Sequence, residues 1–321
     1  MLNSKKYLKI LFIILGMIVT TSLGYSVYFS KNYPVPILDH ISFDAKIQFI
    51  REHVDIDKID TLVVGSSLAL NNVQGAYLEK ASEKAKHVLN LSVWSVSTLQ
   101  VKQLLELAEV FPKLERIIYT GQFTSFNHAS IFKKFDADFI RKYISHELNP
   151  VKYSAFILNA CKDISFCIKR QEEWKKEYGV NNKFSYLGFD HTGSAPLHIY
   201  GKDIVKKRWT KVDGSVQNPN ALKSLAQMAY NAHEKKIKFY FFQQPYRQAQ
   251  IDKHKHIQEI MNTFPKTMKK ILSKNHGIFF NLHERLHLSD AYFADRSHLN
   301  DKGSKIVAET MGKLIDENEM K

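Results

Sequence analysis

The sequence predicts an α/β protein: a mainly parallel sheet between two layers of helices, a three-layer α/β/α sandwich, on an N-terminal transmembrane helix. Short apolar runs rich in β-branched and aromatic residues alternate with longer segments whose apolar residues recur at helical spacing. Strands that alternate with helices in this way predict a parallel sheet covered on both faces. A long uncharged apolar run near the N-terminus predicts the transmembrane helix.

The uncharged run extends from residue 10 to residue 29. At about 1.5 Å per residue, a helix over this run spans roughly 30 Å, the hydrocarbon thickness of a bilayer. The lysines that precede it, Lys5, Lys6 and Lys9, predict a cytoplasmic N-terminus by the positive-inside rule. We expect residues 1–31 to anchor the chain once in the cytoplasmic (inner) membrane and residues 32–321 to form a periplasmic or other extracytoplasmic domain. The alternative is a cleaved signal peptide, although no clear A-x-A site follows the run.

Five apolar runs are expected to form the strands of the sheet. They lie at residues 61–64, 87–93, 116–119, 237–242 and 277–282. Helices are expected at residues 45–53, 99–107, 221–234 and 252–273, and from residue 301 onward. The order of these elements is the alternation that a parallel α/β sheet requires.

The alternation stops between about residues 127 and 215, which we interpret as an insertion on the α/β core. The insertion is either a lid or substrate-binding surface, or a helical decoration without contact to substrate. Its two cysteines, Cys161 and Cys167, are compatible with an oxidising compartment. On one continuous helix they would lie about 9 Å apart, too far for a disulfide. The sequence leaves their pairing open.

The chain is strongly basic, with 46 Lys plus Arg against 32 Asp plus Glu and a formal net charge of +14. Such an excess suits nucleic acid, anionic lipid or an acidic polysaccharide. The basic residues are scattered along the chain, and no nucleic-acid-binding motif accompanies them. We therefore expect no nucleic-acid partner.

A serine and an Asp-His pair are expected at the same rim of the sheet. In open parallel sheets, sites form at the carboxyl ends of the strands. The first strand ends at Gly65-Ser66-Ser67, and Asp295 and His298 lie between the fifth strand and the last helix. An Asp that orients a His, and a His that takes a proton from a serine, form a hydrolytic triad. We therefore predict Ser67 as nucleophile, His298 as general base and Asp295 as the residue that orients it.

Three short motifs in this order resemble those of the SGNH (GDSL-like) hydrolase superfamily. They are Gly-Ser-Ser after the first strand, Asn-Leu-x-x-x-Ser at residues 90–95, and Asp-x-x-His-Leu-Asn at residues 295–300. The resemblance covers roughly residues 58–125 and 220–316. It is closest to a membrane-anchored, exported branch that includes accessory acyltransferases of alginate O-acetylation and the D-alanyl transfer protein of teichoic acid synthesis. The resemblance implies a flavodoxin-like sandwich.

The resemblance also implies how the reaction's oxyanion is held: by backbone N–H groups of the nucleophile and of a second-block Gly, and by a third-block Asn side chain. Ser66 stands here where the first block usually has Asp, Ser95 stands at the Gly position, and Phe123 stands at the Asn position. Gln122 and Asn127 carry amides close to the missing Asn and are candidates for the third donor. Loss of one such donor costs about 10²–10³ in rate.

The expected activity is serine-dependent O-acyl transfer, with acetyl the expected group, or ester hydrolysis on a cell-envelope polysaccharide. No cofactor is expected, and a multi-pass membrane acyltransferase is the expected partner that delivers the acyl group. Transferase and esterase share the first half-reaction, so the sequence does not separate them. Tyr246 and Arg247, after the fourth strand, are candidates for substrate contact. The alternative is a non-catalytic glycan-binding or assembly protein on the same scaffold, which the missing third-block Asn supports.

Residues 283–287, His-Glu-Arg-Leu-His, match the H-E-x-x-H pattern of zinc metalloproteases. That chemistry requires both histidines on one helical face and a third ligand. The match begins directly after a strand, and Phe293 stands where the metzincin continuation has a histidine. Glu309 is a distant candidate for the third ligand. A zinc metallohydrolase through His283 and His287 is therefore a minor alternative.

Overall fold

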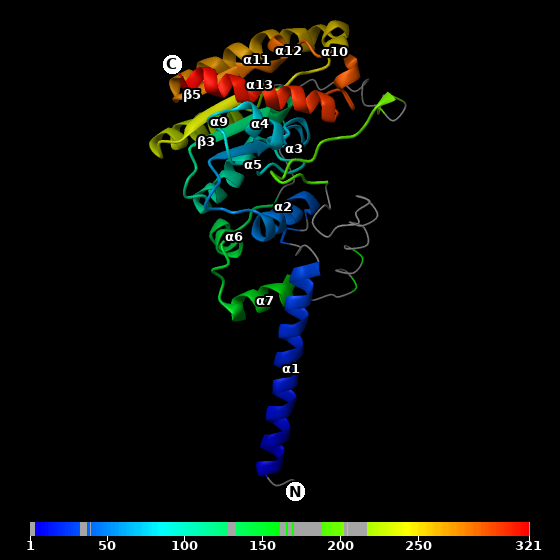
Figure 1. Ribbon diagram of the computed structural model, residues 1–321, viewed down its shortest axis with the longest axis vertical. Helices are drawn as coiled ribbons and strands as arrows, with labels where there is room; N and C mark the ends of the chain where they lie inside the picture. Colours follow the sequence, from blue (N-terminus) through cyan, green and yellow to red (C-terminus); the bar gives the residue numbers. More distant parts are fainter. Residues whose placement is uncertain are drawn as a thin grey trace.

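A long N-terminal helix projects from an α/β domain in the computed structural model (Figure 1). The structure describes residues 4–32, 37–38, 40–127, 133–160, 165, 169, 188–201, 204 and 217–320. Cys161 and Cys167 lie outside the described residues, so their pairing stays open.

The sheet has five parallel strands, as the alternation of strands and helices predicts. They are β1 (Thr61–Gly65), β2 (Val88–Asn90), β3 (Arg116–Gly121), β4 (Lys238–Gln243) and β5 (Gly277–Asn281). Their order is β2-β1-β3-β4-β5, and every neighbouring pair is parallel. The direction of strand progression therefore reverses between β1 and β3. In open α/β sheets, ligands bind outside the carboxyl ends of the strands at such a reversal.

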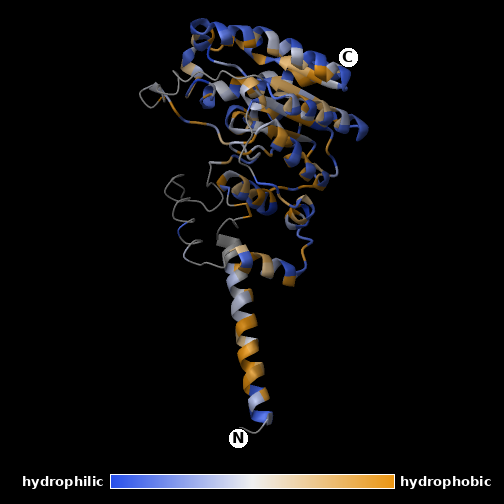
Figure 2. Ribbon diagram, turned by 180° about the vertical axis from the view of Figure 1, so that it is seen from behind, coloured by the Kyte–Doolittle hydropathy of each residue, from blue (hydrophilic) through white to orange (hydrophobic). Residues whose placement is uncertain are grey.

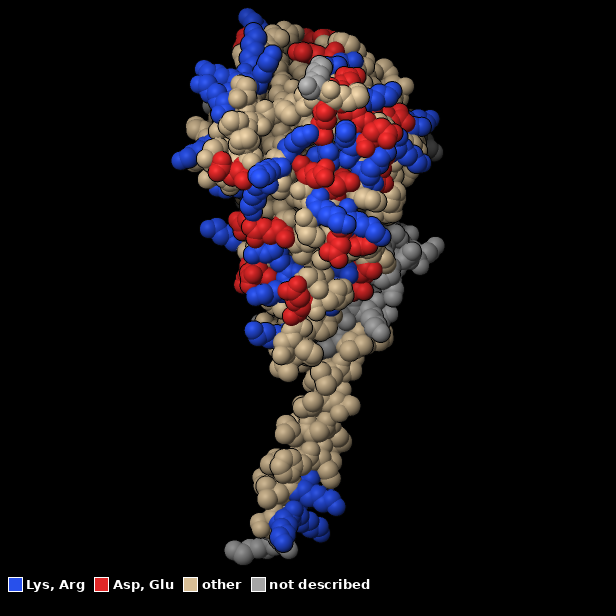
Figure 3. Space-filling view, turned by 60° about the vertical axis from the view of Figure 1, so that its left-hand side comes forward, with Lys and Arg blue, Asp and Glu red and all other residues tan. Residues whose placement is uncertain are grey.

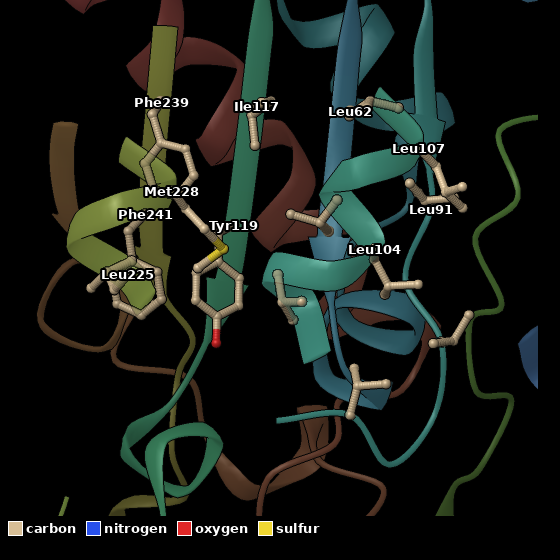
Figure 4. Close-up of a cluster of buried hydrophobic side chains, with 14 of the residues drawn as sticks. Leu62, Leu91, Leu104, Leu107, Ile117, Tyr119, Leu225, Met228, Phe239 and Phe241 are labelled. Atoms are coloured by element: carbon tan, nitrogen blue, oxygen red, sulfur yellow. The ribbon is translucent and has the colours of Figure 1, made fainter. Parts of the chain in front are cut away.

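Alternate residues of the central strands pack into one large apolar cluster. Because successive strand residues point to opposite faces, Leu62, Ile117, Tyr119, Phe239 and Phe241 share one face (Figure 4). The helices that contribute buried residues to this cluster include α2 (Ile41–His53), α5 (Thr98–Leu104), α9 (Pro219–Glu234) and α11 (Lys255–Lys274).

The remaining strand residues form a second cluster. Val63, Ile118, Tyr240 and Phe242 pack with buried residues of α3 (Ser67–Asn72), α4 (Gly75–Ala81) and α13 (Asp301–Glu319). In α13, Val307, Met311 and Leu314 recur at helical spacing. The helix that follows the Asp-His pair in sequence is therefore buried against the sheet along its length.

β2 and the helix predicted over 252–273 differ from the sequence expectation for identifiable reasons. β2 ends at Asn90, three residues earlier than predicted, because the Asn90 side chain accepts the Ser92 N–H at 3.1 Å and turns the chain. The helix predicted over 252–273 is interrupted at His254, whose backbone is extended, and so divides into α10 (Gln248–Lys253) and α11.

The described part of the 127–215 segment has two helices and one largely irregular stretch. The helices are α6 (Ala137–Ile144) and α7 (Pro150–Ala160), which follow a 3₁₀ turn, η2 (Phe123–Phe126). Elsewhere in the domain, α5 continues into the 3₁₀ turn η1 (Leu105–Val110). The connection from β5 to α13 contains α12 (Leu282–Leu286) and the 3₁₀ turn η5 (Asp290–Tyr292). Residues 188–201, called segment 188–201 below, are largely irregular, with a turn at residues 191–192.

The N-terminal helix α1 (Ser4–Asn32) is long and apolar enough to cross a membrane over Ser4–Tyr25. Its apolar side chains are exposed, and the hydropathy colouring shows hydrophobic residues in the middle part of the helix (Figure 2). Lysines lie at its free end, whereas charges of both signs are mixed on the face of the domain in view (Figure 3). Near the domain, Tyr25 of α1 packs with Ile157 of α7.

Candidate active site

A sharp turn at the end of β1 places Ser67 at the rim of the sheet. Gly65 has φ +155°, and a Cβ at this position would lie 2.5 Å from the Thr120 carbonyl oxygen and 2.6 Å from the Ala69 Cβ. Only glycine fits there without a shift of backbone. Ser66 then caps α3, because its side chain accepts the Leu68 N–H at 3.3 Å. Ser67 is consequently the first residue of α3.

The Asp-His pair lies in a tight turn that one carboxylate organises. Oδ1 of Asp295 accepts the N–H groups of Ser297 at 2.9 Å and of His298 at 2.8 Å. The Ala294 N–H donates to the His298 carbonyl at 2.9 Å, which closes the turn. These bonds leave Oδ2 of Asp295 directed at the His298 ring, where it lies 2.8 Å from Nδ1.

The structure brings Ser67, His298 and Asp295 into one hydrogen-bonded line. Nε2 of His298 lies 2.8 Å from Oγ of Ser67, although the two residues are 231 positions apart. Asp295 is buried and His298 half-buried. An ionised carboxylate only accepts hydrogen bonds, so Nδ1 of His298 carries the proton and Nε2 accepts the Ser67 hydroxyl. This is the arrangement that a general base requires.

The surroundings of Asp295 favour its ionised form. Burial alone would raise the pKa of this carboxyl, but hydrogen bonds from the His298 ring, the charge that His298 carries when protonated, and the N–H groups of His298 and Ser297 outweigh that effect. The pKa of Asp295 is held well below its usual range. Asp295 is therefore a fixed negative partner for the imidazole.

Asn72, the last residue of α3, ties the Asp-His turn to the helix that carries Ser67. Its amide nitrogen donates to the Ser297 carbonyl at 3.0 Å, and its amide oxygen accepts the Leu299 N–H at 2.8 Å. The side chain is fully buried. Both ends of the amide are therefore used to set the distance between Ser67 and His298.

A pocket of about 390 Å³ opens beside the triad. Its lining residues come from four separate stretches of the chain: Ser67, Asn71, Trp94, Ser95, Leu197, Ile199, Ala294, Asp295 and His298. The reacting groups are polar, and the walls include the indole of Trp94 and the apolar side chains of Leu197 and Ile199. The pocket therefore presents a hydroxyl and a general base beside a partly apolar cavity.

Segment 188–201 supplies one wall of this pocket, and backbone bonds hold it there. The Ala195 N–H donates to Leu70 O and the Asp301 N–H donates to Leu197 O, each at 2.9 Å. This part of the segment is therefore held between α3 and the start of α13.

A buried lysine fixes the other end of segment 188–201. Nζ of Lys46 donates to Asn90 O at 2.6 Å and to Gly193 O, and it lies 4.1 Å from the centre of the Phe189 ring. Burial lowers the pKa of Lys46 to about 7, while the charge of Asp190 acts in the opposite direction. Lys46 thus joins α2, the end of β2 and segment 188–201.

Ser95 lies in the pocket wall in a left-handed backbone conformation, with φ +56°. A residue with a Cβ adopts this conformation at a cost of about 1–2 kcal/mol. Glycine, the residue that the resemblance implies at this position, adopts this conformation without that cost.

Gln122 and Asn127, the two candidates for the third oxyanion donor, do not line the pocket. The Gln122 amide nitrogen donates to Pro245 O at 2.5 Å. Among the described residues, neither side-chain polar atom of Asn127 has a hydrogen-bond partner. Phe123, at the family's Asn position, is buried against Tyr246 with ring centroids 5.3 Å apart. An aromatic contact therefore occupies the place of the expected amide.

Tyr246 and Arg247 also lie away from the pocket lining. Arg247 is buried, forms an ion pair with Asp290 and donates its N–H to Arg296 O at 3.3 Å. Tyr246 is buried, and its N–H donates to Nδ1 of His283. Both residues therefore bond to the segment between β5 and the Asp-His turn.

The H-E-x-x-H residues do not form the helical zinc signature. α12 ends at Leu286, and His287 follows it in a left-handed conformation with φ +42°. His283 Nδ1 accepts the Tyr246 N–H at 3.4 Å. Among the described residues, no group of three or more His, Cys, Asp or Glu side chains is placed to hold a metal ion.

No protein-family model and no curated protein matches this chain. The assignment of the site therefore depends on its geometry alone.

The sequence motifs do not reveal five residues of the site: Asn71, Asn72, Trp94, Leu197 and Ile199. The polar Asn71-Asn72 pair in an otherwise apolar short helix is a sequence signal for the first two.

Asp295→Asn removes one pH-dependent contribution to folding. An unfolded Asp has a pKa of about 3.9, above that of folded Asp295. Between the two values the unfolded chain binds a proton that the folded chain does not, so this contribution is present above about pH 4 and is lost as pH falls further. We expect the free energy of unfolding of the wild type to fall more steeply below about pH 4 than that of Asp295→Asn.

Chemical denaturation of the full-length proteins in detergent measures both slopes. Asp57→Asn, which changes an exposed carboxylate, is the matched control and should keep the wild-type slope. Parallel pH dependences of the wild type and Asp295→Asn would contradict the depressed pKa.

Proposed function

We propose that this protein is a serine-dependent O-acyl transferase or esterase that acts through an acyl-Ser67 intermediate. The observation that carries the proposal is the line from Ser67 Oγ to His298 Nε2 and from His298 Nδ1 to Asp295 Oδ2, with both distances 2.8 Å. The partly apolar pocket beside Ser67 is of a size to admit a small acyl group.

In the first half-reaction, Ser67 Oγ attacks the acyl carbonyl while His298 Nε2 takes the hydroxyl proton. The tetrahedral intermediate collapses when the donor's leaving group departs with that proton, which leaves an ester on Ser67. In the second, a sugar hydroxyl or water gives its proton to His298 and attacks this ester, and Ser67 regains a proton. Asp295 stabilises the imidazolium in both steps.

Asn71 is our assignment for the third oxyanion donor. It follows Ser67 by four residues, so the two side chains share one face of α3, and both line the pocket. An amide nitrogen carries two N–H groups, and one of them donates to Ala195 O at 2.6 Å. The second N–H is assigned to the oxyanion, together with the Ser67 N–H, which has no partner within the helix because Ser67 is the first helical residue.

The proposed substrate is a cell-envelope polysaccharide, and the proposed fold is the three-layer sandwich of the SGNH superfamily. Two apolar clusters, one for each set of alternate strand residues, support the sandwich. The length and apolar surface of α1 support a membrane anchor, and its N-terminal lysines favour a cytoplasmic N-terminus with an extracytoplasmic domain. A multi-pass membrane acyltransferase remains the proposed acyl donor.

A non-catalytic glycan-binding protein on the same scaffold is the second candidate. The observation that favours it is the position of Gln122 and Asn127, whose amides lie outside the pocket lining. Binding alone would not require the hydroxyl of Ser67. The two candidates therefore differ in what the loss of this hydroxyl does.

Ser67→Ala should lower kcat/KM for p-nitrophenyl acetate by about 10³-fold or more, because the nucleophile is lost. The assay uses full-length protein in detergent. Ser66→Thr is the matched control: it keeps the hydroxyl that caps α3 and should retain activity within about threefold. Equal activity in wild type and Ser67→Ala would reject the nucleophile, and loss of activity in EDTA would favour the zinc alternative.

Asn71→Ala should lower kcat for the same ester by about 10²–10³-fold with a smaller change in KM, because an oxyanion donor acts mainly in the transition state. Asn127→Ala removes the amide that the resemblance offers instead and should leave kcat within about threefold. The reverse pattern, a loss in Asn127→Ala alone, would overturn the assignment of Asn71.

A further inference from the structure

The described part of the insertion is joined to the membrane helix through α7. Ile157 of α7 is buried in a small apolar cluster with Tyr25 of α1 and with Tyr153, Phe156 and Ala160 of its own helix. Phe156 also packs on Phe139 of α6, with ring centroids 4.8 Å apart. α7 is therefore fixed to both α1 and the domain.

α7 is apolar on the opposite side as well. Val151, Ala155 and Leu158 recur at helical spacing, and all three are exposed, Val151 to 75% and Leu158 to 36%. The helix contains no acidic residue, and Lys152 is its one charged residue. A short helix with one apolar face buried in protein and a second apolar face uncovered by described residues can pack that second face on an apolar partner.

The point at which α7 contacts α1 indicates the nature of that partner. The apolar span of α1 ends at Tyr25, and a helix of its length crosses about 33 Å, slightly more than the hydrocarbon thickness of a bilayer. The uncharged run extends four residues further, to Phe29, so Tyr25 lies in the outer end of the span, close to the membrane–water boundary where tyrosine is enriched. α7 packs on this residue and runs crosswise to α1 (Figure 1). A helix in that position lies along the membrane surface.

We infer that the face of α7 formed by Val151, Ala155 and Leu158 is inserted into the outer boundary of the lipid bilayer that α1 crosses. Its partner is the lipid at the junction of headgroups and acyl chains, where amphipathic helices bury apolar side chains. The domain then has two attachments to the membrane, α1 across it and α7 along it. Two attachments restrict rotation of the domain about α1 and hold the Ser67 pocket at a set height and orientation above the surface.

This inference rests on the membrane placement of α1 and does not depend on the chemistry of Ser67. The test places a genetically encoded diazirine side chain at position 151 or 158 of the full-length protein, which is reconstituted in vesicles of phosphatidylethanolamine and phosphatidylglycerol. Photolysis and mass spectrometry then count lipid adducts. Val19 in the span is the positive control, and the exposed apolar residues Tyr230 and Met320 are the matched negative controls.

Lipid adducts at 151 and 158 should exceed those at 230 and 320 by at least about tenfold, because only a side chain in the boundary region meets lipid continuously. Adduct yields at 151 and 158 no higher than at 320 would overturn the inference, as would adducts to a second protein chain. The absence of lipid adducts at position 19 would also overturn the inference, because it would mean that α1 does not cross the bilayer. That result would not affect the activity assigned to Ser67.

Discussion

One buried amide sets the geometry of the candidate site. Asn72 donates to the Ser297 carbonyl and accepts the Leu299 N–H, so it joins the end of α3 to the Asp-His turn more than two hundred residues away. Each bond contributes about 1 kcal/mol to stability, and their main effect is on position. Apolar packing supports the same junction, because Ala69 of α3 and Leu299, next to His298, lie in one buried cluster.

The rest of the fold supports this junction from both ends of α13. At the site, Asn300 caps the helix by accepting the Gly303 N–H at 3.1 Å. At the opposite end, Glu319 forms a bidentate pair with the buried Arg116 at 2.7 and 2.9 Å. Burial works against the ionised Glu319, but Arg116, Lys238 and Tyr240 outweigh it and lower the pKa of Glu319 to about 2. The helix behind the Asp-His turn is thus fixed against the sheet.

The parallel sheet could be predicted from the sequence. So could the proximity of Ser67, Asp295 and His298, because the strand ends of a parallel sheet converge on one rim. The sequence did not predict the roles of Asn71 and Asn72, since their partners Ala195 and Ser297 are distant in sequence. Gln122 carries a suitable amide, but the direction of that amide depends on Pro245, in the loop that follows β4. Leu197 and Ile199 reach the pocket through backbone bonds that have no signature in residue type.

The most direct measurement of the central claim is to trap the acyl group on the enzyme. Full-length protein mixed with p-nitrophenyl acetate and quenched in acid within one turnover is digested and analysed by mass spectrometry. The proposed mechanism predicts one acetyl group on the peptide that contains Ser67, located on Ser67 itself and absent from Ser67→Ala. Turnover of the ester without acetylation of Ser67, or with acetylation of another residue that Ser67→Ala leaves unchanged, would contradict it.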